Sequence, residues 1–85
     1  MKEIKCVITD ELGLHARPAG SLVKAANGYQ CDIKVGRPDK MVDAKRIMGV
    51  MGLAMKHNDE LILTFDGADE DVAASEMEAF IKANV

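Results

Sequence analysis

Residues 4–26, IKCVITDELGLHARPAGSLVKAA, are the most informative stretch for the fold, because the spacing of their apolar side chains changes partway along. Apolar residues first alternate at Ile4, Cys6 and Ile8, which is the period of a half-buried strand. A polar break at 10–13 ends this strand. The apolar residues then recur at helical spacing, at Ala16, Ala19, Leu22, Val23 and Ala26. The stretch therefore predicts a strand followed by an amphipathic helix.

The rest of the chain continues the alternation of strands and helices. The first helix is expected to stop at Asn27-Gly28, where Gly28 is free to take a positive φ. Alternation and β-branched content predict three further strands, at 31–36, 40–43 and 60–65. The first two of these are joined by a turn that contains Gly and Pro, so we expect them to pair antiparallel.

Two segments follow other patterns. Residues 47–53 are short and apolar but contain two glycines, so their periodicity alone leaves strand or helix open. Acidic residues at 69–71 suit the first turn of a final helix. The apolar stripe of that helix is Ala73, Ala74, Met77, Phe80 and Ile81. Four strands and two long amphipathic helices predict a two-layer α+β domain with one sheet face open to solvent.

Length and composition predict a single domain spanning residues 1–85, since 48% of the residues are hydrophobic and 29% are charged. The N-terminus alternates charged and apolar residues, unlike a signal peptide. The uncharged run at 47–55 is far too short to span a membrane, so we expect a cytoplasmic protein without membrane insertion. Cys6 and Cys31 are too few and too isolated for a disulfide framework or a zinc site, and we expect buried free thiols.

The net charge of −3 is unevenly distributed. Residues 1–56 contain ten Lys and Arg against six Asp and Glu, which gives +4, whereas residues 57–85 contain one Lys against eight acids, which gives −7. The positive first part favours a phosphate ligand and an acidic partner surface. It contains no basic run interleaved with aromatic residues, so we expect no nucleic-acid binding.

Residues 13–19, Gly-Leu-His-Ala-Arg-Pro-Ala, combine a histidine, an arginine and a proline at the predicted helix start. The first turn of a helix suits an anion, because it presents unpaired N–H groups and the positive end of the macrodipole. Pro18 is tolerated there, since its missing N–H has no partner to lose. His15 could carry a phosphoryl group, and Arg17 could cover its oxygens. From chemistry alone, the alternative is a helix start with an incidental surface His and Arg.

Three stretches together are similar to one protein family. Residues 13–19, 44–51 and 67–70 resemble the HPr family, the phosphocarrier proteins of the bacterial phosphoenolpyruvate:sugar phosphotransferase system. The resemblance covers essentially the whole chain without gaps. It implies that 47–53 is a short helix and that the elements follow the order βαββαβα. The implied fold is an open-faced sandwich, a four-stranded antiparallel sheet with three helices on one face.

The resemblance also implies a function. His15 would accept a phosphoryl group on Nδ1 from phosphorylated Enzyme I and pass it to sugar-specific Enzyme II components, among them Enzyme IIA. Arg17 and the backbone N–H groups of Ala16 and Arg17 would stabilise that group. The chain has no second catalytic dyad and no cofactor motif, so we expect a carrier rather than an enzyme, without a cofactor or a metal. His57 lies in a polar turn and is interpreted as a solvated loop histidine.

The resemblance places a partner-docking helix at 47–53, beside the histidine. A short helix cannot bury every side, and we expect Val50 and Leu53 to face the sheet. Exposed methionines suit the binding of several partners. The expected contact residues are Gly20, Ile47, Met48 and Met51. The alternative is that the apolar residues of this set belong to the core.

The chain departs from the family's pattern at Arg46, at Gly52, where a Ser or Thr is common, and at Ala54. Many Gram-positive members carry a serine where this chain has Arg46, and a kinase phosphorylates that serine to control carbon catabolite repression. Arg46 cannot be phosphorylated in that way, and no Ser or Thr lies between residues 43 and 56 to replace it, so we expect this branch of regulation to be absent. Ala54 stands where a glycine often ends the second helix. It is less suited to a left-handed cap, so we expect the helix to run on or close differently.

Two functions are compatible with the sequence. The first is a phosphocarrier in sugar uptake. The second is an HPr-like paralogue that acts as a regulatory binding module in a non-sugar phosphorelay, where the phosphorylation state of His15 informs other proteins. The presence of His15 and Arg17 and the lack of the regulatory serine favour the first. We expect a monomer.

Overall fold

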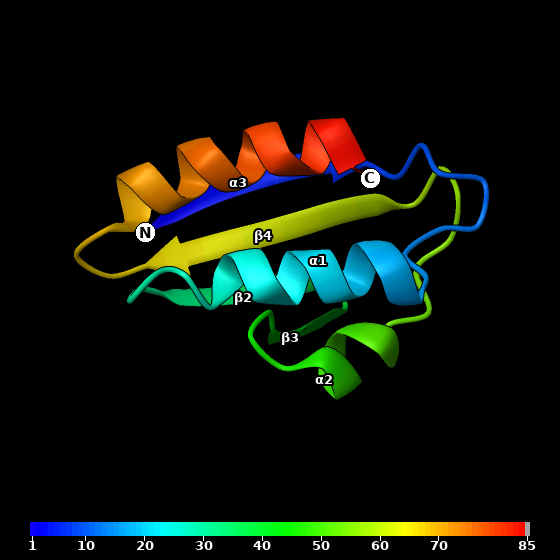
Figure 1. Cartoon of the computed structure of the whole chain (residues 1–85), viewed down its shortest axis with the longest axis horizontal. Coiled ribbons are helices and arrows are strands. Elements are labelled where there is room, and N and C mark those ends of the chain that lie inside the picture. The colour runs from blue at the N-terminus through cyan, green and yellow to red at the C-terminus, as the bar shows by residue number, and fades with distance from the viewer. Residues whose placement is uncertain (85) are drawn as a thin grey trace.

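The computed structural model describes residues 1–84, and its elements confirm the order βαββαβα (Figure 1). The described elements are β1 (Lys2–Val7), α1 (Ala16–Ala26), β2 (Asp32–Arg37), β3 (Lys40–Asp43), α2 (Ile47–Met51), β4 (Glu60–Asp66) and α3 (Glu70–Asn84). The predicted strand at 40–43 matches β3 at both ends, whereas α2 ends two residues earlier than expected. None of these helices is long and apolar enough to cross a membrane.

The four strands form one antiparallel sheet in the order β1-β4-β2-β3. In its register, Ile4 of β1 lies opposite Leu63 of β4, and Ile33 of β2 lies opposite Phe65. Leu63, Phe65 and Ile33 are buried. Because side chains alternate along a strand, these residues and Ile4 share one face, and the core is built on that face.

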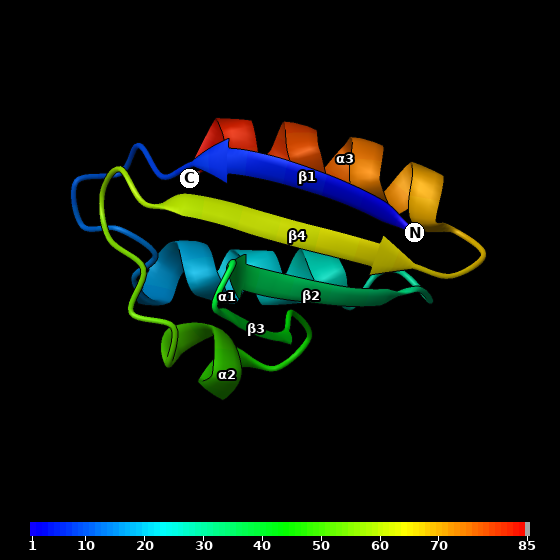
Figure 2. The ribbon, with the colours of Figure 1, turned by 180° about the vertical axis from the view of Figure 1, so that it is seen from behind.

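Helices α1 and α3 lie next to each other over the core face of the sheet (Figures 1 and 2). Leu22 of α1 and Met77 and Ile81 of α3 are buried beneath them. The shorter α2 packs against α1 and β3. On the other face of the sheet, Lys5 and Lys34 are exposed. The predicted two-layer α+β sandwich with one open sheet face is therefore confirmed.

The end of α1 corrects one prediction. Gly28 does not take a positive φ, and Asn27 remains helical with a φ of −69°. The backbone N–H and the side-chain Nδ2 of Asn27 both donate to the Val23 oxygen, at 3.0 and 2.9 Å. The Gly28 N–H donates to the Ala25 oxygen at 3.0 Å. The last carbonyls are thus satisfied without a left-handed glycine.

A second correction concerns Ala54, which follows α2 and takes a positive φ of 52°. This is the left-handed conformation that we expected an alanine to avoid. The residues on either side, Leu53 and Met55, are both buried. The burial of these two side chains offsets the roughly 1–2 kcal/mol that a left-handed alanine costs.

The two cysteines are free, as predicted, but they differ in burial. Cys31 is buried, and desolvation followed by a hydrogen bond to Asp69 raises its pKa to about 11. Cys6 is only half-buried, because β1 is an edge strand with a single neighbour. Desolvation raises the pKa of the Cys6 thiol as well.

Candidate functional site

The loop between β1 and α1 is held against the segment that follows α2. Leu14 N–H donates to the Met55 oxygen at 3.0 Å, and Gly13 N–H donates to the Asp10 oxygen at 2.9 Å. Gly13 has a φ of 71°, and a Cβ at this position would clash with the Met55 carbonyl. Leu14 is buried. These contacts fix the point at which α1 begins, and with it the position of His15.

His15 is the residue that precedes α1. Its backbone is extended, and its carbonyl oxygen accepts the N–H of Ala19 at 3.0 Å, the first hydrogen bond of the helix. Pro18 is buried in the first turn and has no N–H, so the N–H groups of Ala16 and Arg17 are the ones left at this end. The first turn carries no acidic side chain. The helix start therefore offers two donors and a positive potential to an anion.

The His15 ring has a carboxylate beside it. Nε2 of His15 lies 3.3 Å from Oδ2 of Asp10, and about a third of each side chain is exposed. The other carboxylate oxygen of Asp10 accepts the N–H of Leu12 at 2.9 Å. This backbone hydrogen bond is the main cause that lowers the pKa of Asp10, and the hydrogen bond with His15 contributes to the same shift.

In the sequence, Asp10 is recognisable only as part of the strand break at 10–13, and its contact with His15 was not predicted. An Asp that bonds the backbone two residues ahead is a common turn former. A turn of this kind shortly before the Gly-Leu-His stretch is the pattern that could have indicated it. The contact itself depends on how the loop folds back, which the sequence does not specify.

Arg17 and His15 line the same small hollow. Its volume is about 250 Å³, and its lining is mostly polar, formed by Asp10, His15, Arg17, Pro18, Ser21 and Ala83. Arg17 is exposed, and its positive charge also contributes to the lowered pKa of Asp10. The hollow therefore combines an imidazole, a guanidinium and a carboxylate at a helix start. This combination can accept an anionic group on the imidazole and cover its oxygens with cationic and N–H donors.

Helix α2 divides into an inner and an outer face in the way the sequence predicts. Val50 of α2 and Leu53, which follows the end of the helix, are completely buried. Met48 is 81% exposed, and Ile47 and Met51 are each 40% exposed, so these three residues are not core. Their part in partner binding stays a prediction.

Two further predicted residues lie beside this face. Gly20 is half-buried on α1, which packs against α2, and apart from its own stretch of helix no described atom lies within 4 Å of where its Cβ would be. Arg46 directly precedes α2 and is mostly exposed, with its Nε 3.6 Å from Oδ2 of Asp43.

A hollow of about 580 Å³ is lined by Val42, Asp43, Lys45, Arg46, Ile47, Met48 and Gly49. His57 lies in an exposed turn between α2 and β4 and does not line the hollow at His15.

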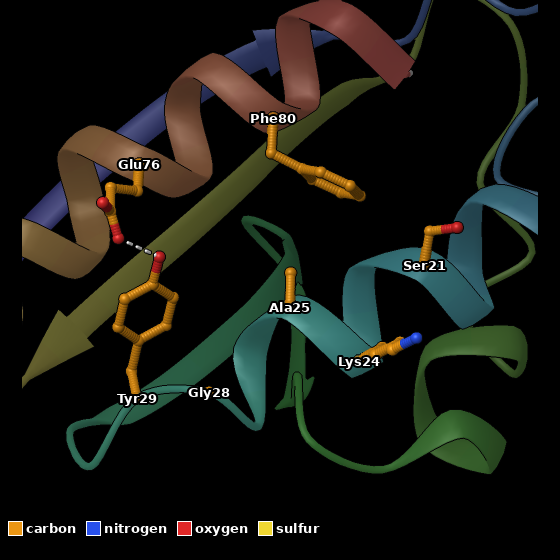
Figure 3. A pocket seen from close by; sticks show the side chains of 7 residues that line it. All are labelled: Ser21, Lys24, Ala25, Gly28, Tyr29, Glu76 and Phe80. Carbon is orange, nitrogen blue, oxygen red and sulfur yellow. Dashed lines mark hydrogen bonds between the residues drawn. The ribbon is translucent and has the colours of Figure 1, made fainter.

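A different hollow of about 600 Å³ lies between α1 and α3 (Figure 3). In it, the Tyr29 hydroxyl donates to Oε1 of Glu76 at 2.5 Å, and this bond raises the pKa of Tyr29 to about 12. Phe80 extends across the hollow toward α1. Its lining includes Lys24 but no histidine or cysteine. The hollow at His15, although it is the smaller of the two, is therefore the candidate site for phosphoryl chemistry.

Comparison with known proteins identifies the family of this chain. Residues 2–83 match the sequence profile of the family described as PTS-HPr, "PTS HPr component phosphorylation site". The chain is 35% identical to the phosphocarrier protein HPr of Mycoplasma genitalium over 99% of its own length and 97% of that protein.

Solved structures have the same fold. HPr from Thermoanaerobacter tengcongensis superposes with a TM-score of 0.92 at 36% identity, covering 99% of this chain and 94% of that one. Crh, a catabolite repression protein of Bacillus subtilis solved as a swapped dimer, superposes with a TM-score of 0.76 at 35% identity over 100% of this chain and 98% of that one. The family profile and the relatives span almost the full chain, and we conclude that it belongs to the HPr family, whose members are phosphocarrier proteins of the phosphotransferase system rather than enzymes.

Proposed function

We propose that this chain accepts a phosphoryl group on His15 from phosphorylated Enzyme I and donates it to Enzyme IIA components of sugar transporters, in the cytoplasm and as a monomer. The observation that carries the proposal is the group of His15, Asp10 and Arg17 around one polar hollow at the start of α1. A phosphohistidine has a labile P–N bond, so one protein can charge it and another can discharge it.

The proposed roles follow from the charge of each group. The neutral imidazole of His15 is the nucleophile. The guanidinium of Arg17 and the N–H groups of Ala16 and Arg17 stabilise the phosphoryl oxygens during transfer. There is little covalent chemistry for the carrier to perform beyond this positioning, since phosphoryl transfer depends mainly on orientation and charge stabilisation.

Docking of partners is assigned to the outer face of α2 together with α1. Ile47, Met48 and Met51 supply exposed apolar contacts, and the open space over Gly20 allows a partner to approach α1 closely. The positive charge of Arg46 lies at one end of this surface and suits an acidic partner. Many Gram-positive members of the family carry a regulatory serine at the position of Arg46. Because an arginine cannot be phosphorylated by that serine kinase, we also propose that this branch of regulation is absent.

The similarity to Crh supports one alternative, an HPr-like paralogue that acts as a regulatory binding module in a non-sugar phosphorelay. Both functions use His15 as a phosphoacceptor, and the carrier function is favoured because Arg46 replaces the serine through which the family's regulation acts. The two functions differ in whether the phosphoryl group moves on.

Onward transfer is therefore the test. The chain is charged with phosphoenolpyruvate and Enzyme I, separated from both, and mixed with an Enzyme IIA. A carrier loses its phosphoryl group to the Enzyme IIA within the mixing period, whereas it keeps the group when mixed with buffer alone. If the chain becomes charged but transfers to none of a panel of Enzyme IIA proteins, the regulatory alternative replaces the proposal.

A further inference from the structure

We propose that Asp10 is a positioning residue, which keeps the proton of the neutral His15 ring on Nε2 so that Nδ1 carries the lone pair that attacks phosphorus. The inference deepens the proposed function and rests on His15 being the phosphoacceptor. The starting observation is that the carboxylate of Asp10 lies next to the ring of His15. A site that only binds phosphate does not need a carboxylate at this place.

The carboxylate of Asp10 is fixed from more than one side. Its Oδ1 accepts the N–H of Leu12 at 2.9 Å, and its backbone oxygen accepts the N–H of Gly13 at 2.9 Å. The loop that contains these residues is in turn bonded to Met55. Oδ2 is the oxygen left over, and it lies 3.3 Å from Nε2 of His15. The side chain of Asp10 is therefore oriented toward the ring by the loop.

An ionised carboxylate can only accept hydrogen bonds. The ring nitrogen that faces it must then be the donor, which makes Nε2 the protonated nitrogen and leaves the lone pair of the neutral ring on Nδ1. Arg17 is the other charged side chain that lines the hollow, and it carries no acceptor that could compete for the ring proton. The pKa of Asp10 is lowered, so the carboxylate is ionised at neutral pH.

The transfer step balances around this arrangement. The Nδ1 lone pair forms a new N–P bond while the bond from phosphorus to the donor's leaving atom breaks, and the electron pair of that bond stays with the donor. Nε2 keeps its proton, so the His15 ring gains one positive charge. The carboxylate of Asp10 faces that charge and stabilises it. On discharge, the N–P bond breaks and its electron pair returns to Nδ1, which restores the neutral ring.

Two substitutions at Asp10 separate this role from others. In Asp10→Asn, Oδ1 still accepts the N–H of Leu12, which turns the amide NH₂ toward Nε2 and moves the ring proton to Nδ1. Asp10→Ala leaves neither donor nor acceptor beside the ring. If Asp10 acted only through its charge, the two variants would be equally slow. If it acted only by supporting the loop, the alanine variant would be the slower one.

The test uses the full chain with phosphoramidate as a small phosphoryl donor, so that partner docking plays no part. The phosphorylation rate is measured by intact mass, and the tautomer of the His15 ring is read from its ¹⁵N chemical shifts. Glu11→Gln is the matched control, since it removes the same charge from the same exposed loop, and Glu11 has no contact with His15 among the described residues.

The expected result is an Nε2–H ring in the wild type and in Glu11→Gln, with equal rates. Asp10→Asn should show an Nδ1–H ring and react about tenfold more slowly than the wild type, and it should also be slower than Asp10→Ala. An Nδ1–H ring in the wild type would overturn the proposal, and this measurement does not depend on any variant being folded. An asparagine variant as fast as the alanine variant would overturn it too. If Enzyme I fails to charge the wild type while these results hold, the proposed function fails and the assignment of the ring proton stands.

Discussion

At the scale of single residues, the position of His15 depends on one glycine. Gly13 has a positive φ and lies directly against the Met55 carbonyl. We predict that Gly13→Ala loses at least about 2 kcal/mol of unfolding free energy, because it adds both backbone strain and a clash with backbone atoms. Gly20→Ala is the matched control and should gain up to about 1 kcal/mol, since it lies within α1 with open space around it. Denaturant unfolding of the two variants checks both values, and a Gly13→Ala protein as stable as the wild type would refute the argument.

Arg17 is expected to act on the phosphoryl group and not on the fold. We predict that Arg17→Ala slows phosphoryl transfer about tenfold or more while its unfolding free energy stays within about 0.5 kcal/mol of the wild type. Lys24→Ala removes an exposed cation from the same helix, outside the hollow at His15, and should transfer normally. The rates of phosphoryl transfer from phosphorylated Enzyme I are measured by quenching the reaction at successive times. A sharp loss of stability with normal transfer would show that Arg17 is structural.

At the scale of elements, α2 has one side buried in the core and one exposed side, which we propose as the docking surface for partners. We predict that Met48→Asp weakens the affinity for Enzyme I about tenfold or more, because the new charge would be desolvated in the complex. Its unfolding free energy should change by less than about 0.5 kcal/mol, since Met48 is exposed. Val72→Asp places the same charge on an exposed apolar position of α3 and should bind normally. Calorimetric titration together with thermal unfolding separates the two effects, and a strongly destabilised Met48→Asp protein would contradict the docking assignment.

A second prediction at this scale concerns the junction between β2 and α3. The carboxylate of Asp69 accepts the N–H groups of Gln30 and Cys31, both at 2.8 Å. The bond from Gln30, followed by that from the Cys31 thiol, lowers the pKa of Asp69 in the folded state. The unfolded state therefore binds this proton more readily, and the stabilisation is present above the unfolded pKa of about 3.9 and is lost as the pH falls through the folded pKa.

Asp69→Asn should accordingly be less stable than the wild type at pH 7. The difference in melting temperature between the two proteins should shrink as the pH is lowered from about 5 to about 2. Asp66→Asn, at the exposed end of β4 nearby, is the control and should follow the wild type. A difference that stays constant across this range would mean that the charge of Asp69 is not what ties the two elements together.

At the scale of the whole molecule, the sequence predicts what depends on neighbouring residues and misses what depends on distant ones. The amphipathic helices α1 and α3 and the strand β3 follow from local sequence patterns. The insertion of β4 between β1 and β2 could not be derived from periodicity, because alternation shows which face a residue occupies and not which strand lies beside it. The nature of residues 47–53 was decided by family resemblance for the same reason, since α2 depends on packing against α1 and β3.

At the His15 site too, the residues close together in sequence could be predicted and the contact between distant segments could not. His15, Arg17 and Pro18 are recognisable because they lie within one turn of sequence, whose geometry a helix start determines. Asp10 reaches the ring only because the loop folds back onto Met55, and this contact is tertiary. Ala54 takes a left-handed conformation against its own preference, because the core on both sides of it fixes the path of the chain.

We propose above all that this chain carries a single phosphoryl group, on His15. It is tested most directly by the intact mass of the wild type, His15→Ala and His57→Ala after incubation with phosphoenolpyruvate and Enzyme I, before and after brief acid treatment. We predict one acid-labile phosphoryl group on the wild type and on His57→Ala, and none on His15→Ala. A phosphoryl group on the His15→Ala protein, or an acid-stable one on the wild type, would contradict the account.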